Sequence, residues 1–338
     1  HAEQRKIRFL EEQLELLREE ARRSHEERVR EQIVARLQPV DESVDSMGDG
    51  SASLLETGLL FTMLVDPDVN AFTYATQLKK WIREVQAELP AEVPPTGAEM
   101  AGALEKVVFR ERGYFTQHEE EELVGDRIPE DPRRVFEDHE AAVLSTQAVM
   151  LDIVRACGYQ EAVATHAPGM ILLDRNAEWE NAAFLHTSTG EFIPLAGLSG
   201  GGCGIGVLES GSATDIPVLS DASFLSLWLV KQKNQITEAH WPEKIVPYLE
   251  TLVELSADDV SSQAELALFQ LKDGGSSRVP DQDLGNLLEK DPGAIDPGRI
   301  MRILQFSGFD VQRLLASQRE VMRAAAHPGH ELHSSPSD

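Results

Sequence analysis

The spacing of apolar residues at the start of the chain predicts a single long helix over residues 1–37. Its apolar residues follow one another at alternating steps of three and four: Ile7, Leu10, Leu14, Leu17 and Ala21. This is the a/d pattern of a coiled coil, and it breaks near residue 24 before it resumes out of phase at Val29 and Ile33. At 1.5 Å per residue, such a helix reaches roughly 50 Å.

Two interpretations of this helix stay open. In the first, its whole length packs on the rest of the protein. In the second, it is an arm that binds a partner helix or forms a dimer. We favour the second, because a narrow apolar stripe on so charged a helix suits a helical partner better than a wide core. The predicted partner-binding residues are Ile7, Leu10, Leu14 and Leu17.

The rest of the pattern predicts a mostly helical α+β protein. Helices are expected at 51–67, 71–89, 96–115, 131–159, 221–239, 243–257 and 261–271, with three more between 281 and 326. Short apolar runs predict strands at 161–167, 169–175, 181–187 and 192–195. The expected organisation is a long helix (1–38), a linker (39–53), an α/β core with a helical lead-in (54–216), a helical region (217–325) and a disordered tail (326–338).

Composition and charge narrow the classes of partner. The chain has 338 residues, 41% of them apolar, and a net charge of −27 at pH 7. Nucleic-acid phosphates and anionic lipid surfaces repel so acidic a protein, so we expect protein partners, above all basic ones, within a larger complex. No apolar run approaches the ~18 residues of a membrane span. Two cysteines offer neither a disulfide framework nor a zinc pattern, and we expect no metal or cofactor.

Two side chains of the predicted helix over 131–159 are candidates for chemistry. Ser145 is expected to be an ordinary helix N-cap, and no G-x-S-x-G nucleophile motif occurs in the chain. Cys157 is expected near the C-terminal end of the helix, where the helix dipole disfavours a thiolate. The sequence therefore predicts that Cys157 is a small buried residue, followed by Gly158 at the helix end.

A second cysteine lies in the glycine-rich loop 197–206. This loop lacks both the G-x-G-x-x-G spacing before a helix and the G-K-[ST] ending of phosphate-binding loops, so nucleotide binding is not predicted. Cys203 could pair with a histidine from a neighbouring predicted strand, either His166 or His186. That pairing stays open as an enzymatic alternative.

Four short motifs occur in order: Asp131-Pro132-Arg133-Arg134-Val135, Val143-Leu144-Ser145-Thr146, Pro168-Gly169-Met170-Ile171 and Phe192-Ile193-Pro194-Leu195. Together they resemble the transglutaminase-like family of the SirB type, which joins a papain-like core to a tetratricopeptide-like helical tail. In that family D-P-x-N-S leads to G-I-P-I-S-L at a helix start, then to P-G-H-F on a strand and an F-[IV]-D-P turn. The resemblance covers about residues 54–322 and implies a transglutaminase-like core followed by a repeat-like tail.

The resemblance also implies that the catalytic positions have degenerated. Ser145 opens the helix that carries the nucleophile in such folds, Met170 replaces the strand histidine, and Pro194 replaces the aspartate. A methionine cannot transfer a proton, and a proline cannot orient an imidazole. We therefore expect a pseudoenzyme that serves as a scaffold, assembly or accessory subunit. The alternative is a cysteine-dependent hydrolase or acyl-transferase that uses Cys203 with His166 or His186.

The compartment is suggested only by the start of the chain and by the resemblance. The chain begins at His1, which loss of a targeting segment would explain, as would trimming. Because the family occurs in bacteria and in plastids, we expect an organelle such as the chloroplast, with the cytoplasm as the alternative.

Overall fold

The protein is mostly helical and of the α+β class in its computed structural model. The structure describes residues 2–37, 53–90, 95–113, 115–116, 128–174, 182–195, 216–238, 242–256 and 258–270. Within these residues it forms nine α-helices and a five-stranded sheet. The chain divides into two units, His1–Leu255 and Ser256–Asp338, and each is described by itself. The domain boundaries expected at 38, 53, 216 and 325 stay predictions.

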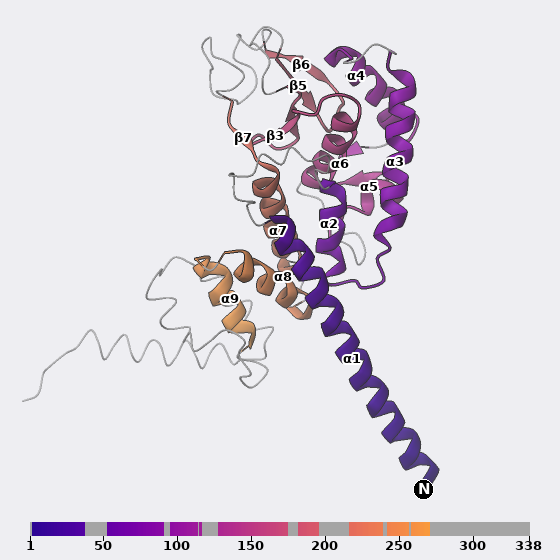
Figure 1. Ribbon diagram of the computed structural model, residues 1–338, viewed down its shortest axis with the longest axis vertical. Helices are drawn as coiled ribbons and strands as arrows, with labels where there is room; N and C mark the ends of the chain where they lie inside the picture. The colour runs from indigo at the N-terminus through magenta and orange to yellow at the C-terminus, as the bar shows by residue number, and fades with distance from the viewer. Residues whose placement is uncertain are drawn as a thin grey trace, which may run out of the picture. The chain divides into compact units, whose positions relative to one another are not determined.

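Helix α1 (Ala2–Leu37) confirms that the start of the chain is a single helix. The buried apolar residues of its C-terminal half are Val29, Ile33, Val34 and Leu37. They face α2 (Leu54–Met63), α7 (Asp221–Glu238) and α8 (Pro242–Leu255), the helices that α1 contacts. The N-terminal half continues beyond these helices (Figure 1). Burial of α1 is therefore confined to its second half.

The helical lead-in consists of α2, α3 (Ala71–Glu88) and α4 (Gly97–Leu104). Thr96 and Glu99 form a capping box that starts α4, and Ser53 accepts a hydrogen bond from the Glu56 N–H at the start of α2. The predicted helix over 96–115 ends earlier, because α4 passes into a π-helix, η1 (Glu105–Arg110). Helices α2 and α4 therefore begin where a capping side chain satisfies free backbone N–H groups, whereas the N-cap residue of α3, Asn70, makes no such hydrogen bond.

The Trp228 side chain of α7 packs closely against the backbone of α2 at Gly58 and so joins the lead-in to α7. A methyl group placed on Gly58 of α2 would lie 2.1 Å from Cη2 of Trp228 on α7, so only glycine leaves room for that indole. Trp228 is fully buried and meets Phe61 edge-on, with ring centroids 6.0 Å apart. Helices α2 and α7 are thus packed through a large aromatic side chain.

The sheet has the antiparallel order β6-β5-β4-β3-β7. Its strands are β3 (Val163–Thr165), β4 (Met170–Leu172), β5 (Ala183–His186), β6 (Phe192–Pro194) and β7 (Val218–Leu219). The first four confirm the strands expected from apolar runs, whereas the two-residue β7 was not predicted. Helix α6 (Val143–Ala156) contacts β3 and β4, and α7 contacts β3 and β7 (Figure 1). All three residues of β4 are buried, as a continuous apolar run predicts.

The predicted helical passage over 131–159 is interrupted in the structure. A short helix, α5 (Arg134–Glu137), is followed by His139 with φ 55° and then by β2 (Glu140–Ala141), which pairs in parallel with β1 (Phe115–Thr116). A left-handed residue cannot continue a right-handed helix, so α6 begins anew at Val143.

Helix α6 ends as its sequence predicts. Gly158 has φ 116°, and the Tyr159 N–H reaches the Val154 oxygen at 3.1 Å, which completes a Schellman motif.

In the second unit, α9 (Val260–Gln270) confirms the helix expected at 261–271. The glycine-rich loop at 197–206, the helices predicted beyond 271 and the tail predicted at 326–338 lie outside the described residues.

Candidate functional site

The buried N-terminus of α6 is the place where the resemblance predicts a nucleophile. Ser145 lies in the first turn of α6 and is fully buried. Its Oγ donates a hydrogen bond to the main-chain oxygen of Glu130 at 2.8 Å and lies 3.1 Å from Oε2 of the same residue. Ser145 is therefore held in a closed polar pair with Glu130, and solvent does not reach its hydroxyl.

The expectation that Ser145 is the N-cap of this helix is wrong. The N-cap position is Ala142, which has no side-chain acceptor, and the Glu130 carboxylate caps the helix instead. It accepts hydrogen bonds from the N–H groups of Ser145 at 2.9 Å and Leu144 at 3.4 Å. An acceptor 15 residues away along the chain thus satisfies the donors that a local cap normally satisfies.

Burial controls the acidity of Glu130. The residue is 1% exposed, and this desolvation raises the pKa of its carboxyl to about 7, although hydrogen bonds from Ser145 and Leu144 oppose the rise. A protonated carboxyl suits the geometry. When Ser145 Oγ donates to the Glu130 main-chain oxygen, the same Oγ can accept a hydrogen bond from the protonated Oε2 of Glu130.

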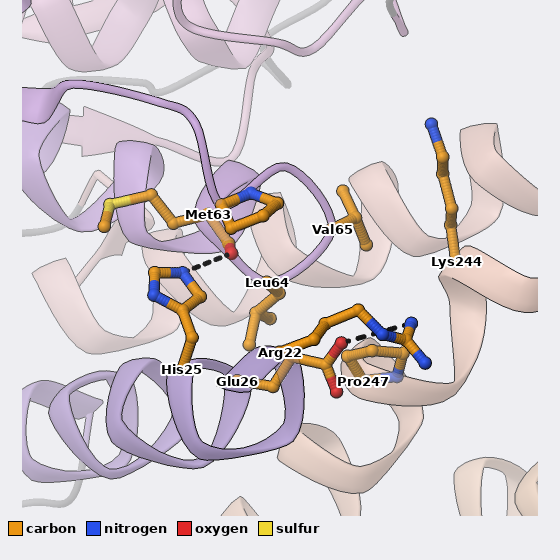
Figure 2. A pocket seen from close by; sticks show the side chains of 9 residues that line it. Arg22, His25, Glu26, Met63, Leu64, Val65, Lys244 and Pro247 are labelled. Carbon is orange, nitrogen blue, oxygen red and sulfur yellow. Dashed lines mark hydrogen bonds and ion pairs between the residues drawn. The ribbon is translucent and has the colours of Figure 1, made fainter. Parts of the chain in front are cut away.

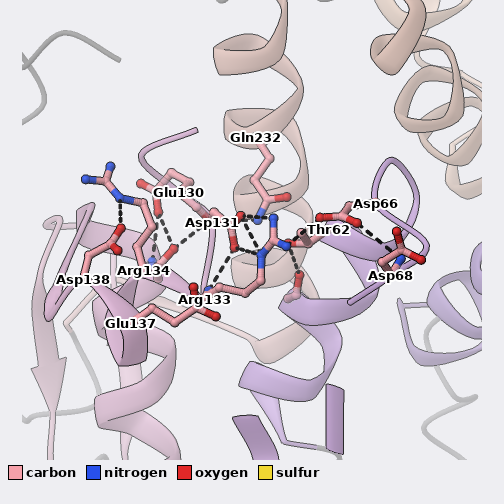
Figure 3. A network of polar contacts seen from close by, with 12 residues as sticks. Thr62, Asp66, Asp68, Glu130, Asp131, Arg133, Arg134, Glu137, Asp138 and Gln232 are labelled. Carbon is pink, nitrogen blue, oxygen red and sulfur yellow. Dashed lines mark hydrogen bonds and ion pairs between the residues drawn. The ribbon is translucent and has the colours of Figure 1, made fainter. Parts of the chain in front are cut away.

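The main chain of Glu130 also ties α6 to α7. Its oxygen accepts hydrogen bonds from Trp228 Nε1 at 3.2 Å and Gln232 Nε2 at 2.9 Å, and its N–H donates to Gln235 Oε1 at 2.9 Å. All three partners lie on α7, and Figure 3 shows Gln232 pointing toward this segment. These contacts support a structural role, because the main-chain N–H and oxygen of Glu130 both bond to side chains of α7.

The neighbouring Asp-Pro motif contributes a second set of fixed charges. Arg133 donates to Asp131 through Nε and Nη2, with Nη2 2.7 Å from Oδ2, and its Nη1 lies 2.6 Å from Oδ2 of Asp66 (Figure 3). This guanidinium therefore bridges the loop before α5 to the loop after α2. A bidentate pair of this kind fixes the orientation of the segment that carries it.

The other degenerate positions lie on the sheet. Met170 is buried on β4 in an apolar cluster with Leu172 and Phe184, and its main-chain oxygen accepts a hydrogen bond from Gln147 Nε2 of α6 at 2.9 Å. Pro194 is exposed on β6, and β5 separates it from β4. The structure thus brings α6 against β4, but Met170 and Pro194 supply neither an acid nor a base there.

The residues of the enzymatic alternative are only partly described. His166 is exposed directly after β3, and His186 is half-buried on β5 with Nδ1 3.3 Å from Thr189 Oγ1. Because β4 lies between those strands, their backbones are about 10 Å apart. Cys203 lies outside the described residues. Cys157 is buried, as predicted, and burial raises the pKa of its thiol to about 11.

No three His, Cys, Asp or Glu side chains among the described residues are grouped to hold a metal ion. In the same residues, no helix is long and apolar enough to cross a membrane.

Six of the eight exposed large apolar side chains among the described residues lie on α1. We call residues 4–24 of this helix the arm. The residues predicted to bind a partner are all exposed there: Ile7, Leu10, Leu14 and Leu17. Two further exposed apolar residues, Phe9 and Leu16, were missed by the sequence analysis, although their spacing of seven marks them as neighbours on one helix face. The arm therefore carries more apolar surface than its a/d stripe alone.

Helix geometry separates the apolar residues of α1 into three faces. At 100° per residue, the stripe from Ile7 to Leu17 lies about 100° around the axis from the buried face at Val29 and Ile33. Phe9 and Leu16 lie about 130° from the stripe on its other side. The stripe is therefore a separate surface and not a continuation of the face that packs on α2 and α8.

The arm meets the rest of its unit at a small pocket (Figure 2). This cavity of about 130 Å³ is lined by Arg22, His25 and Glu26 of α1 together with residues of the loop after α2 and of α8. Nε2 of His25 lies 3.2 Å from the Met63 main-chain oxygen, and Arg22 pairs with Glu26 at 3.5 Å. These contacts mark the position along α1 at which exposure gives way to packing.

No family model, curated protein or solved structure matches this chain. The resemblance to the transglutaminase-like family therefore stays a prediction.

Proposed function

We propose that the protein is a non-catalytic scaffold, assembly or accessory subunit that binds other proteins through the apolar stripe of its arm. One observation carries this proposal: Ile7, Leu10, Leu14 and Leu17 are exposed on a helix whose second half is buried. Burial of each such side chain stabilises a complex by roughly 1.5–3 kcal/mol. An exposed stripe of this kind is typical of a surface that a partner covers.

The absence of catalysis is a part of this proposal. We propose that the α/β core is a degenerate transglutaminase-like core and that the C-terminal part is a tetratricopeptide-like helical region. The closed pair of Ser145 and Glu130 supports a structural use of the helix start, as do Met170 and Pro194 at the matching positions. We also propose an organelle such as the chloroplast as the compartment.

The charge of the chain indicates the chemistry of the partners. With a net charge of −27, the protein attracts basic surfaces, and this attraction weakens once salt reduces the screening length below ~8 Å. Apolar contacts by the arm are insensitive to such screening. Binding that combines both should lose part of its affinity, but not all, at high salt.

Affinity purification of the full chain, followed by mass spectrometry, tests the proposal. The double variant Leu10→Asp with Leu17→Asp should release the co-purifying proteins while its thermal unfolding stays that of the parent. A matched control, Phe9→Asp with Leu16→Asp, changes equally exposed residues outside the stripe and should keep them. Undiminished recovery of the same proteins by the first variant would contradict the proposal.

The non-catalytic part has its own test. An electrophilic probe for thiols and serines should leave Ser145 unlabelled, because its hydroxyl is buried and bonded to Glu130. Rapid stoichiometric labelling of Cys203 that His166→Ala or His186→Ala abolishes would overturn the scaffold proposal in favour of a cysteine-dependent enzyme.

A further inference from the structure

We propose that the arm pairs with the arm of a second copy of this chain, in a parallel two-stranded coiled coil that runs from Ile7 to Ala21. This inference rests on the proposed function, because it names the partner of the same apolar stripe. It is carried by two independent features of α1: the direction in which the stripe faces and the charges that flank it.

The direction of the stripe makes room for a second copy. In a parallel pair both bodies lie at the same end of the coiled coil, so they must not collide. The stripe faces about 100° away from the buried face at Val29 and Ile33. From Ile7 to Leu17 its side chains are exposed, so α2 and α8 of the same chain do not cover the side that a second helix would occupy, and Met63 of α2 meets that side only beyond the stripe, at His25. The phase break near residue 24 is the sequence feature that produces this geometry.

The charges beside the stripe favour the parallel orientation. With Ile7 and Leu14 at a positions, the g positions are Lys6, Gln13 and Glu20, and the e positions are Glu11, Arg18 and His25. In a parallel pair each g residue faces the e residue five positions later in the second copy. The resulting pairs within the arm are Lys6 with Glu11 and Gln13 with Arg18, whereas His25, the e residue five positions after Glu20, is bonded to Met63 of its own body.

None of these pairs joins like charges. An antiparallel pair that matches Ile7 with Leu17 also brings Lys6 near Glu20 of the second copy, but it places Glu11 against Glu11, a repulsive contact that the parallel pair does not contain. The arm as a whole is also nearly neutral, with six basic and five acidic residues between positions 4 and 24, although the chain carries −27. Two arms can therefore approach without the repulsion that their bodies exert on each other.

The helix is already formed before a partner arrives. Isolated helices of this length are marginal in water, but the arm continues a segment whose second half is packed in the body. Association then needs only side-chain burial and not helix nucleation. Phe9 and Leu16 fall at c positions, outside the a/d core, and so provide an internal control.

Two neighbouring leucines give a matched pair of variants. Leu16 is 63% exposed and Leu17 is 62% exposed, but only Leu17 lies in the stripe. Sedimentation equilibrium of the full chain over a range of concentrations should show a dimer for the parent and for Leu16→Asp. Leu17→Asp should weaken the dimer by at least roughly 100-fold. A parent that stays monomeric, or equal weakening by both variants, would overturn the inference.

Charge reversal tests the flanking pairs. Lys6→Glu places two acids at the predicted Lys6–Glu11 contacts and should weaken the dimer, since each such pair occurs twice in a symmetric complex. Addition of Glu11→Lys should restore it. Failure of the double variant to regain the parent's affinity would argue against this register.

Cross-linking tests the orientation. A parallel pair brings residue 14 next to residue 14, so Leu14→Cys should form a covalent dimer on mild oxidation, with the parent chain as the control for its native cysteines. Cross-linking only in a mixture of Leu10→Cys and Leu14→Cys chains would indicate an antiparallel pair and overturn the parallel one. A monomeric parent whose Leu10→Asp with Leu17→Asp variant still loses other proteins would refute the dimer and leave the proposed function standing.

Discussion

The arm and the N-terminus of α6 reverse the usual distribution of apolar and polar side chains. In the arm Leu17 is 62% exposed, whereas at the start of α6 Glu130 is 1% exposed. The buried carboxyl has its hydrogen-bond partners within the same fold, Ser145 and Leu144. The exposed leucine is instead directed at something outside the body. The polar groups at the start of α6 are thus satisfied within the fold, whereas the apolar stripe of the arm is left exposed, and this contrast supports the proposed association.

The largest effect on stability should come from placing a charged side chain in the buried half of α1. Ile33 is fully buried, so Ile33→Asp places a charge in the core and should lower the free energy of unfolding by ~4 kcal/mol or more. Leu17→Asp, on the same helix, should change the stability of the isolated monomer by less than about 0.5 kcal/mol. Urea unfolding monitored by circular dichroism measures both. Similar losses would erase the distinction between the two halves.

The buried carboxyl of Glu130 should make the free energy of unfolding depend on pH. Because burial raises the pKa of Glu130 to about 7 from 4.5, the folded protein keeps a proton that the unfolded chain releases. The stability that this proton contributes is fully present below about pH 4.5 and is lost as the pH rises through about 7. Linkage over this window corresponds to about 3 kcal/mol of unfolding free energy.

Unfolding experiments between pH 4.5 and pH 8 measure this loss, and Glu130→Gln is the matched variant. The amide keeps the shape and one acceptor oxygen but does not titrate in this range. It should therefore show a smaller fall in stability than the parent across the same window, by about the 3 kcal/mol assigned to Glu130. Identical pH profiles for the two proteins would show that Glu130 is ionised in the folded protein.

A smaller effect is expected at the other helix that is capped by a remote carboxylate. Asp152 of α6 accepts hydrogen bonds from Ser53 Oγ at 2.6 Å and from the N–H groups of Leu54 at 3.1 Å and Leu55 at 3.0 Å. Asp152→Ala should cost about 1–2 kcal/mol, because it leaves the start of α2 without this acceptor.

Glu15→Ala in the exposed arm is the matched control for Asp152→Ala. Its carboxylate is exposed and lies 3.6 Å from Arg18, a contact that solvent screens, so the change should be nearly silent. Thermal unfolding of both variants at one pH measures the difference. Equal effects would mean that the remote cap on α2 contributes no more than a surface ion pair.

Periodicity and apolar runs were sufficient to predict most of the body. Helix α3, predicted at 71–89, spans Ala71–Glu88, and α7, predicted at 221–239, spans Asp221–Glu238. The phase break within α1 was also readable, because it depends only on the spacing of apolar residues along one helix. Local pattern predicts such elements well when local and tertiary preferences agree.

Features that depend on distant contacts could not be predicted in the same way. Nothing local marks His139 as a residue with positive φ, so the break between α5 and α6 was missed. The cap on α6 comes from Glu130, which lies too far along the chain for a capping motif, and Ser145 was therefore misassigned. Phe9 and Leu16 were a different kind of omission, since their spacing is visible but falls outside the a/d stripe.

Because α1 is one uninterrupted helix, it holds the stripe at a fixed distance and angle from the buried face that packs on α2, α7 and α8. From Ile7 to His25 the axial distance is about 27 Å, and the stripe cannot turn without turning the buried face. One residue inserted between Leu17 and Val29 would lengthen the helix by about 1.5 Å and rotate the stripe by about 100°. The angle between the stripe and the buried face of α1 is thus set by the number of residues between them. A single inserted residue would rotate the stripe relative to the body without changing a residue of the stripe or of the buried face.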